Sequence, residues 1–232
     1  MKKAFVSCDV SQNIAQISKI EALPLLPYDS LDAPVCSHAD MLVFIIGRKI
    51  FTYKDYYKKN PSVFETAKSD GYELCFVAKQ CEREYPNDIA LNVLTVGKTL
   101  FANSKHTAVE ILEYAKKNGY DLVDVKQGYS ACSTLVLSDK CLITADKSIY
   151  NAAKKASIDA VLINSGEILL EGYSCGFIGG ASFVFENVVY FMGDIKKHSS
   201  YKKIKDKIDS LGMRISLISS GNVFDFGGIR LI

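Results

Sequence analysis

The stretch Ser133–Asp146, STLVLSDKCLITAD, contains two β-rich runs joined by a polar turn at Ser138–Lys140, and it ends in an aspartate. Two such runs separated by a few turn residues predict a β-hairpin. Asp146 can then cap a helix, because its side-chain oxygens accept hydrogen bonds from free N–H groups of the first helical turn. The stretch therefore predicts two paired strands followed directly by a helix.

The same pattern recurs along the chain at intervals of 43 to 48 residues. Ala181–Asp194, ASFVFENVVYFMGD, matches the first stretch position for position. In all, a β-rich run ending in Asp or Asn stands at AFVSCD (Asp9), IFTYKD (Asp55), TLFAN (Asn103), CLITAD (Asp146) and YFMGD (Asp194). A repeat with a period in this range signals stacked or radially arranged supersecondary units.

A helix and then a third short strand are expected after these endpoints. The helices are recognised from apolar residues at helical spacing together with capping residues, proline starts and glycine stops. The expected helices are Ser62–Ser69, Thr107–Asn118, Ile149–Ala156 and Tyr201–Leu211, and the third strands are Glu73–Val77, Asp121–Val125, Asp159–Ile163 and Arg214–Ile218. The unit is therefore strand, strand, helix, strand.

The two ends of the chain each carry part of one unit. The first copy lacks its leading strand, and the last copy has only a leading strand, expected within Asn222–Ile232. Pairing of these two parts would close a ring and remove exposed sheet edges. We expect one α/β domain over residues 1–232, with five ββαβ units and the fifth unit closed by the N- and C-terminal strands. A layered α/β sheet with similar periodicity is the alternative.

The composition is that of an ordinary globular protein, with 48% hydrophobic residues and a net charge of +2 over 232 residues. This balance gives no reason to expect nucleic acid or an anionic membrane as a partner. The longest apolar run, Met41–Gly47, is too short to cross a bilayer. Seven cysteines without CxxC spacing indicate neither a disulfide framework nor a zinc site, so we expect a cytoplasmic protein. No metal or cofactor motif is present.

Five ββαβ units with the last one divided between the termini resemble the pentein fold. This α/β propeller is the fold of the amidinotransferases, arginine deiminases and dimethylarginine dimethylaminohydrolases, which modify guanidino groups. Four segments also resemble a bacterial family of pentein-like proteins of unassigned function: Pro34–Leu42, Val125–Leu137, Gly176–Phe183 and Asp225–Gly228. The resemblance implies a central funnel in which carboxylates hold a guanidinium, a histidine acts as acid and base, and a cysteine attacks the guanidinium carbon.

Asp40 and His38 are the first candidates for such a site. Asp40 is expected to start the leading strand of its unit, where a bidentate carboxylate would suit a planar cation with a fork of N–H donors. Capping of a turn is the alternative role. His38 lies two residues earlier, so both side chains could face the same side of an extended segment. The resemblance implies that His38 is the acid/base.

The C-terminus departs from the enzymes. Asp225–Gly228, DFGG, resembles the segment that precedes their nucleophilic cysteine, but the chain continues as Ile229–Ile232 without one. Cys132, directly before a leading strand, is the candidate replacement, because a cysteine near a histidine can be activated as a thiolate. A small buried residue is its alternative role. Cys36 and Cys175 occupy comparable loop positions and are weaker candidates.

Further polar and glycine residues complete the expected substrate site. Clustered polar side chains precede Cys132, and a bare glycine loop allows a close approach to a ligand. The remaining substrate-binding candidates are Lys126, Gln127, Tyr129, Ser133, Gly179, Gly180 and Asp225. Two functions follow as hypotheses. The first is a hydrolase or transferase acting on a guanidino or amidino C–N bond, and the alternative is a non-catalytic binding protein for a small cationic ligand.

Overall fold

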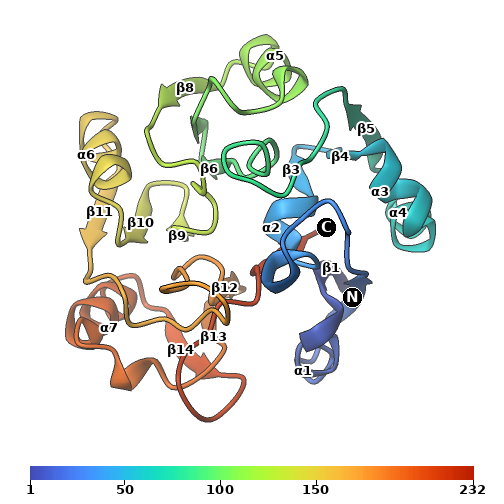
Figure 1. Ribbon diagram of the computed structural model, residues 1–232. Helices are drawn as coiled ribbons and strands as arrows, with labels where there is room; N and C mark the ends of the chain where they lie inside the picture. Colours follow the sequence, from blue (N-terminus) through green and yellow to red (C-terminus); the bar gives the residue numbers. More distant parts are fainter.

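The computed structural model describes the whole chain, Met1–Ile232. Five separate three-stranded sheets lie around a common centre (Figure 1). In four of them a leading strand pairs antiparallel with the next strand, which in turn pairs parallel with a third strand. These sheets are β3 (Phe44–Ile46), β4 (Lys49–Tyr53) and β5 (Glu73–Val77); β6 (Leu94–Val96), β7 (Thr99–Ala102) and β8 (Asp121–Asp124); β9 (Thr134–Ser138), β10 (Cys141–Thr144) and β11 (Asp159–Leu162); and β12 (Ser182–Phe185), β13 (Val188–Phe191) and β14 (Arg214–Leu217). The fold is therefore mixed α/β, and the expected repeat of strand, strand, helix, strand is present.

The fifth sheet joins the two ends of the chain. Its middle strand β1 (Lys2–Ser7) pairs antiparallel with β15 (Ile229–Leu231) and parallel with β2 (Ile20–Leu25). This confirms that the termini complete one unit. The terminal strand is shorter than the expected stretch from Asn222, since Gly227 and Gly228 have positive φ angles of 81° and 58° and interrupt the extended backbone.

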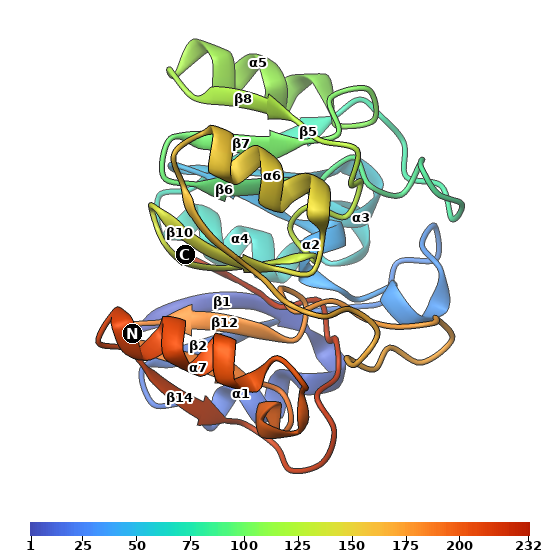
Figure 2. The ribbon, with the colours of Figure 1, turned by 90° about the vertical axis from the view of Figure 1, so that its left-hand side faces the viewer.

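Helices connect the second and third strands of each unit and lie on the outside of the arrangement (Figure 1). Seen from the side, α6 and α7 lie in front of their sheets (Figure 2). The outer helices are α1 (Ser11–Ala15), α3 (Lys54–Lys59), α4 (Pro61–Ser69), α5 (Val109–Lys117), α6 (Lys147–Lys155) and α7 (Tyr201–Ser210). Parallel strands need a crossover connection, and in each unit a helix supplies it.

The predicted helix starts are confirmed only in part. Asp146 caps α6 as expected, and its carboxylate accepts a hydrogen bond from the amide of Ile149 at 2.8 Å. Ser200 stands at the N-cap of α7, but its hydroxyl accepts from the amide of Asn164 instead. For α5 the N-cap is Ala108, and no side chain caps the helix. The Ser200 hydroxyl thus binds the loop of a neighbouring unit instead of capping its own helix.

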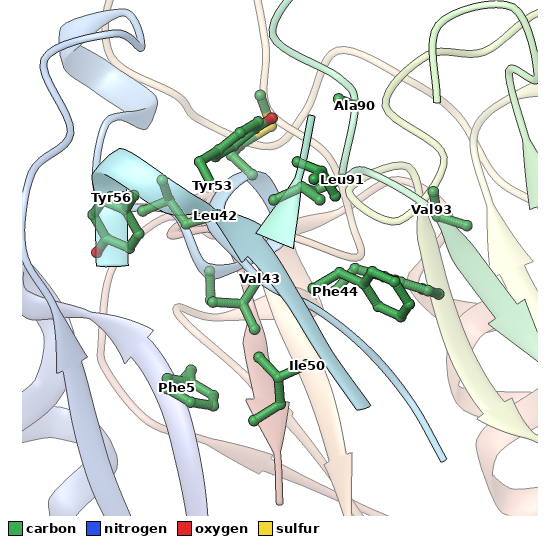
Figure 3. Packing of buried hydrophobic residues seen from close by; sticks show 14 of the residues in the cluster. Phe5, Leu42, Val43, Phe44, Ile50, Tyr53, Tyr56, Ala90, Leu91 and Val93 are labelled. Carbon is green, nitrogen blue, oxygen red and sulfur yellow. The ribbon is translucent and has the colours of Figure 1, made fainter. Parts of the chain in front are cut away.

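The largest hydrophobic cluster contains 30 buried residues and joins the first units (Figure 3). Phe5 of β1, Ile50 of β4 and Leu100 of β7 belong to it. Three smaller clusters lie under the remaining sheets and helices. Burial of these apolar faces stabilises the units by roughly 25 cal/mol per Å² removed from water. The clusters hold the inner ends of the leading strands close to one another, and the site described below lies at those ends.

One short helix lies inside the ring of sheets rather than outside it (Figure 1). Helix α2 (Ala39–Leu42) immediately precedes β3, and His38 is its N-cap. The prediction that Asp40 starts a strand is therefore wrong, as is the extended spacing expected between His38 and Asp40. No helix of the protein has the length and apolar character needed to cross a membrane.

Candidate functional site

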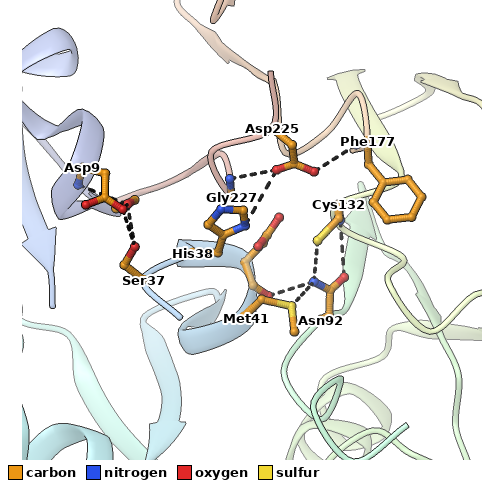
Figure 4. A network of polar contacts seen from close by, with 11 residues as sticks. Asp9, Ser37, His38, Met41, Asn92, Cys132, Phe177, Asp225 and Gly227 are labelled. Atoms are coloured by element: carbon orange, nitrogen blue, oxygen red, sulfur yellow. Dashed lines mark hydrogen bonds and ion pairs between the residues drawn. The ribbon is translucent and has the colours of Figure 1, made fainter. Parts of the chain in front are cut away.

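Polar side chains meet at the centre, just before the leading strands begin (Figure 4). Asn92, which lies two residues before β6, connects three segments. Its amide nitrogen donates to the Sγ of Cys132 at 2.8 Å and to the backbone carbonyl of Asp40 at 3.1 Å. Its oxygen accepts from the amides of Ala131 and Cys132 at 2.9 and 3.3 Å. Asn92 thus fixes the position of the Cys132 loop relative to helix α2.

Asp40 is a buried carboxylate without a partner. The residue is 1% exposed, and neither side-chain oxygen has a hydrogen-bond partner. Its amide donates to the carbonyl of Gly227 at 3.1 Å, so its backbone is tied to the C-terminal segment. Burial of an ionised carboxylate without a partner is costly. No Lys or Arg forms an ion pair with Asp40.

Asp225 supplies a second buried carboxylate to the same cluster. Its two oxygens accept hydrogen bonds from the amides of Phe177 and Gly227, both at 2.9 Å. Burial, followed by the nearby negative charge of Asp40, raises the pKa of Asp225 from 3.8 to about 7. The two amide donors act in the opposite direction. Near neutral pH Asp225 is therefore only partly ionised.

His38 lies beside Asp225 and is 5% exposed. Its Nδ1 is 3.8 Å from Oδ1 of Asp225 (Figure 4). Burial lowers the pKa of His38 below 6.5, although the charges of Asp40 and Asp9 favour the protonated form. His38 is therefore neutral at pH 7 and can accept or donate a proton through its two ring nitrogens.

Cys132 is 4% exposed, with its sulfur directed toward Asn92 (Figure 4). Burial raises its pKa well above 9, and the charges of Asp40 and Asp225 raise it further. In this state Cys132 is a thiol rather than a thiolate. A cation placed beside the two carboxylates would offset the second effect and favour the thiolate.

Two glycines allow this cluster to pack closely. A Cβ added to Gly227 would lie 2.4 Å from the Cβ of His38, and one added to Gly180 would lie 2.0 Å from Oδ1 of Asp225. Gly180 also donates to the carbonyl of Cys132 at 3.1 Å and accepts from the amide of Gly228 at 2.9 Å. Gly179 is enclosed by backbone oxygens that include those of Ala131 and Cys132. Gly180 and Gly227 thus pack against the cluster without room for a side chain.

The polar residues expected ahead of Cys132 are not all brought to the cluster. Lys126 is exposed, and no hydrogen bond or ion pair joins its ammonium group to the cluster. Gln127 donates to Asp146 at 3.0 Å, and the Ser133 hydroxyl donates to the carbonyl of Tyr129 at 2.6 Å. Gln127 and Ser133 therefore form hydrogen bonds outside the cluster, and Lys126 faces solvent.

Tyr129 lies closer to the candidate centre. Its hydroxyl donates to the buried carboxylate of Asp88 at 2.6 Å, and its ring packs against Phe177 and Tyr85 with centroids 6.0 and 5.5 Å apart. Phe177 is also the residue whose amide binds Asp225. Tyr129 and Phe177 thus connect the loop ahead of Cys132 with the segment whose amide binds Asp225.

The other cysteines have different surroundings. Cys36 and Cys175 are partly exposed loop residues, and no hydrogen bond joins either sulfur to the central cluster. All seven cysteines are free. No group of three His, Cys, Asp or Glu residues is arranged to hold a metal ion. Cys132 is the cysteine that the fold brings to the carboxylates.

Sequence reasoning missed Asn92. An asparagine ahead of an apolar run is typical of a turn. Only the equivalence of its position in the repeat to that of Cys132 could have singled it out. Cys132 and Asn92 precede β9 and β6 by two residues each. The equivalence of residues in neighbouring units was therefore the available signal.

A model of a protein family covers residues 5–230 of the chain. The chain belongs to this family, which is described as a family of unknown function (DUF6873). A search of curated proteins finds no match. The family assignment therefore carries no activity with it.

Solved structures with the same fold are enzymes. Dimethylarginine dimethylaminohydrolase from Pseudomonas aeruginosa, complexed with citrulline, is 12% identical with a TM-score of 0.60, covering 98% of this chain and 96% of its own. The N-terminal domain of ArgZ, an arginine dihydrolase from cyanobacteria, is 11% identical with a TM-score of 0.58, covering 93% and 90%. SxtG, an amidinotransferase from Microseira wollei in the saxitoxin pathway, is 11% identical with a TM-score of 0.56, covering 89% and 72%. At these identities the similarity establishes a pentein-type fold and no activity.

Proposed function

We propose that the five units form a pentein propeller whose centre binds a small cation of the guanidino or amidino type. The observation that carries this proposal is the Asp40 carboxylate, which is buried without a hydrogen-bond partner next to a second buried acid, Asp225. A guanidinium presents a planar fork of N–H donors that suits the two oxygens of one carboxylate. Cation binding would supply the partner that Asp40 lacks.

The charge of such a ligand would change the protonation of the whole cluster. A positive charge near Asp225 opposes the effect of Asp40, so the pKa of Asp225 falls on binding and a proton is released. The same charge lowers the pKa of Cys132, which Asp40 and Asp225 raise. Ligand binding and formation of the thiolate are thus linked through one electrostatic field.

We further propose that Cys132 attacks the bound carbon. The sulfur forms a bond to the amidino carbon as its proton passes to a base, and the C–N bond breaks as the leaving amine takes up a proton. Water then cleaves the S–C bond and regenerates the thiol. His38 is the acid/base assigned to these transfers, because it is neutral at pH 7 and lies in the same cluster.

A binding protein without catalysis is the second candidate. One observation favours it: burial and the nearby charges of Asp40 and Asp225 raise the pKa of Cys132. Both candidates take a small cationic ligand at the same carboxylates, and they differ only in the role of the sulfur. The seven free cysteines favour a reducing cytoplasm as the place where either function is carried out.

Titration calorimetry with arginine, agmatine and methylguanidine tests ligand binding. We expect saturable binding that weakens about tenfold or more in Asp40→Asn, because a charge-assisted pair is lost. Asp139→Asn is the matched control, since Asp139 is an exposed turn residue and its loss removes the same charge. Equal binding by the wild type and Asp40→Asn would contradict the proposal.

Product analysis separates the two candidates. The ligand that binds most tightly is incubated with wild-type protein and with Cys132→Ser, and released amine and intact protein mass are measured. Amine release that requires Cys132, with a transient mass increase, supports the enzyme. Tight binding without amine release or adduct supports the binding protein.

A further inference from the structure

A second central feature lies beside the leading strands, beyond the polar cluster. A cavity of about 260 Å³ is lined by residues of all five of them, β3, β6, β9, β12 and β15. Ile45, Thr95, Val136, Val184 and Arg230 contribute to it from successive units. The cavity therefore lies among the leading strands of the five sheets.

One charged donor lines this cavity without an ion-pair partner, and two unpartnered hydroxyl groups lie covered behind its wall. The guanidinium of Arg230 donates only to the carbonyl of Ile229, at 3.0 Å, and no carboxylate lies within ion-pair distance of it. The buried hydroxyl oxygens of Thr95 and Thr134 have no partner. Thr134 is 4% exposed. Polar atoms so deeply buried normally have partners.

No acidic residue lines the cavity, and most of its surface is apolar. Arg230 is the one charged residue among those that line it. The wall thus combines a planar cationic fork with aliphatic side chains such as Val136 and Val184, and two unpartnered hydroxyl groups lie covered behind it. A carboxylate matches the guanidinium fork with two parallel hydrogen bonds, and the aliphatic wall favours a carboxylate that carries a hydrocarbon chain.

We propose that this cavity is a binding site for a short-chain aliphatic monocarboxylate. Its carboxylate contacts the Arg230 guanidinium, and its hydrocarbon part lies against the valines and isoleucine of the neighbouring strands. The Thr95 and Thr134 hydroxyl groups, which are covered and have no partner in the structure, turn to donate to the carboxylate. The volume suits a ligand of a few carbon atoms and is smaller than the roughly 300–1,000 Å³ typical of drug-sized ligands.

This site is separate from the acidic cluster. Neither Asp40 nor Asp225 lines the cavity. Ala131, Thr134 and Gly179 line it, and they are sequence neighbours of Cys132 and Gly180. The loops that carry the cluster thus separate an anion site from a cation site, and the proposal does not depend on the function proposed above.

Calorimetric titration with butyrate tests the proposal, with butylamine and chloride at matched ionic strength as controls. We expect saturable binding of butyrate and none of butylamine. Arg230→Met keeps the length of the side chain, removes the charge and weakens binding about tenfold or more. Arg230→Lys keeps the charge without the fork and gives an intermediate affinity.

Thr134→Val is nearly isosteric and keeps the test meaningful if an Arg230 variant misfolds. It is expected to weaken butyrate binding severalfold. Asp40→Asn, at the other site, should bind butyrate as the wild type does. Absence of saturable butyrate binding, or unchanged affinity in Arg230→Met and Thr134→Val, would overturn the proposal, and chloride binding as tight as butyrate binding would overturn the assignment to carboxylates.

Discussion

The acidic cluster of Asp40 and Asp225 and the cavity lined by Arg230 are neighbours at the centre of the protein, yet they carry opposite charge. Asp40 and Asp225 are 1% and 5% exposed, whereas Arg230 is only partly buried. Neither end contains a charged partner for its own group, because His38, which lies beside Asp225, is neutral at pH 7. An uncompensated charge costs more where water is excluded. The comparison therefore predicts that changes at the acidic end have larger effects on stability.

The largest effect is expected from Gly227→Ala. The new methyl group would meet His38 at 2.4 Å, and the backbone would keep a φ of +81°. We expect a loss of about 3 kcal/mol or more in the free energy of unfolding, measured by chemical denaturation. Gly119→Ala is the matched control. Its φ is +69° and its added Cβ meets nothing within 4 Å, so only the backbone cost of about 1 kcal/mol should remain. Equal losses in the two variants would show that the contact with His38 does not matter.

Asp40→Asn should increase stability in the absence of ligand. The substitution keeps the shape of the side chain and removes a buried charge without a partner, so the free energy of unfolding should rise by about 1–3 kcal/mol. Asp139→Asn, an exposed change of the same charge, should stay within about 0.5 kcal/mol. Destabilisation by Asp40→Asn would mean that the carboxylate has a partner within the protein.

The pH dependence of stability should reveal Asp225. Its pKa is about 7 in the folded protein and near 4 when unfolded, so the folded state binds more protons between these values. Its contribution to stability is therefore present below pH 4 and is lost as the pH rises to 7. The slope approaches about 1.4 kcal/mol per pH unit.

His38 acts in the opposite direction, because its folded pKa is lowered and its contribution grows as the pH rises toward 6.5. The difference between wild type and Asp225→Asn isolates the aspartate. Denaturation of both proteins across this pH range is the measurement. Parallel curves would contradict the raised pKa of Asp225.

Alkylation rates should distinguish Cys132 from cysteines outside the centre. At neutral pH and without ligand, Cys132 should react about tenfold or more slowly than the partly exposed Cys175, since it is a buried thiol with a raised pKa. Peptide mass spectrometry after timed iodoacetamide treatment gives both rates. Fast labelling of Cys132 in the free protein would show that it is already a thiolate.

The smallest effect is expected at the other end of the comparison. Arg230→Met should change the free energy of unfolding by about 0.5 kcal/mol or less, because its guanidinium is only partly buried and has no ion pair. The double variant with Asp40→Asn should be additive within about 0.5 kcal/mol if the two ends are independent. A larger coupling energy would show that the two charges stabilise each other across the centre.

Sequence patterns predicted the hairpins and crossovers well. Ser133–Asp146 became β9, β10 and the cap of α6, and Glu73–Val77 became β5 with the expected bounds. These features depend on neighbours a few residues apart, so the local sequence contains the information. The pairing of β1 with β15 was also predictable, because each end of the chain lacked what the other supplied.

The candidate site was predicted less completely. His38, Asp40, Cys132 and Asp225 do meet, but helix α2 replaced the expected strand, and Asn92 was missed. Lys126 was a candidate because it belongs to the polar residues ahead of Cys132, but it faces solvent. Which side chain enters the centre depends on how loops from different units pack, and local spacing contains no record of that packing.

The sequence by itself determined the repeating unit, the number of units and the closure by the two termini, because each follows from hydrophobic periodicity and local turn chemistry. Only the tertiary structure decided the charges at the centre. It buried Asp40 and Asp225 together, kept Cys132 protonated and left Arg230 without a carboxylate. The physical reason is that the energy of a charge depends on the water and partners around it, and residues far apart in the chain provide both.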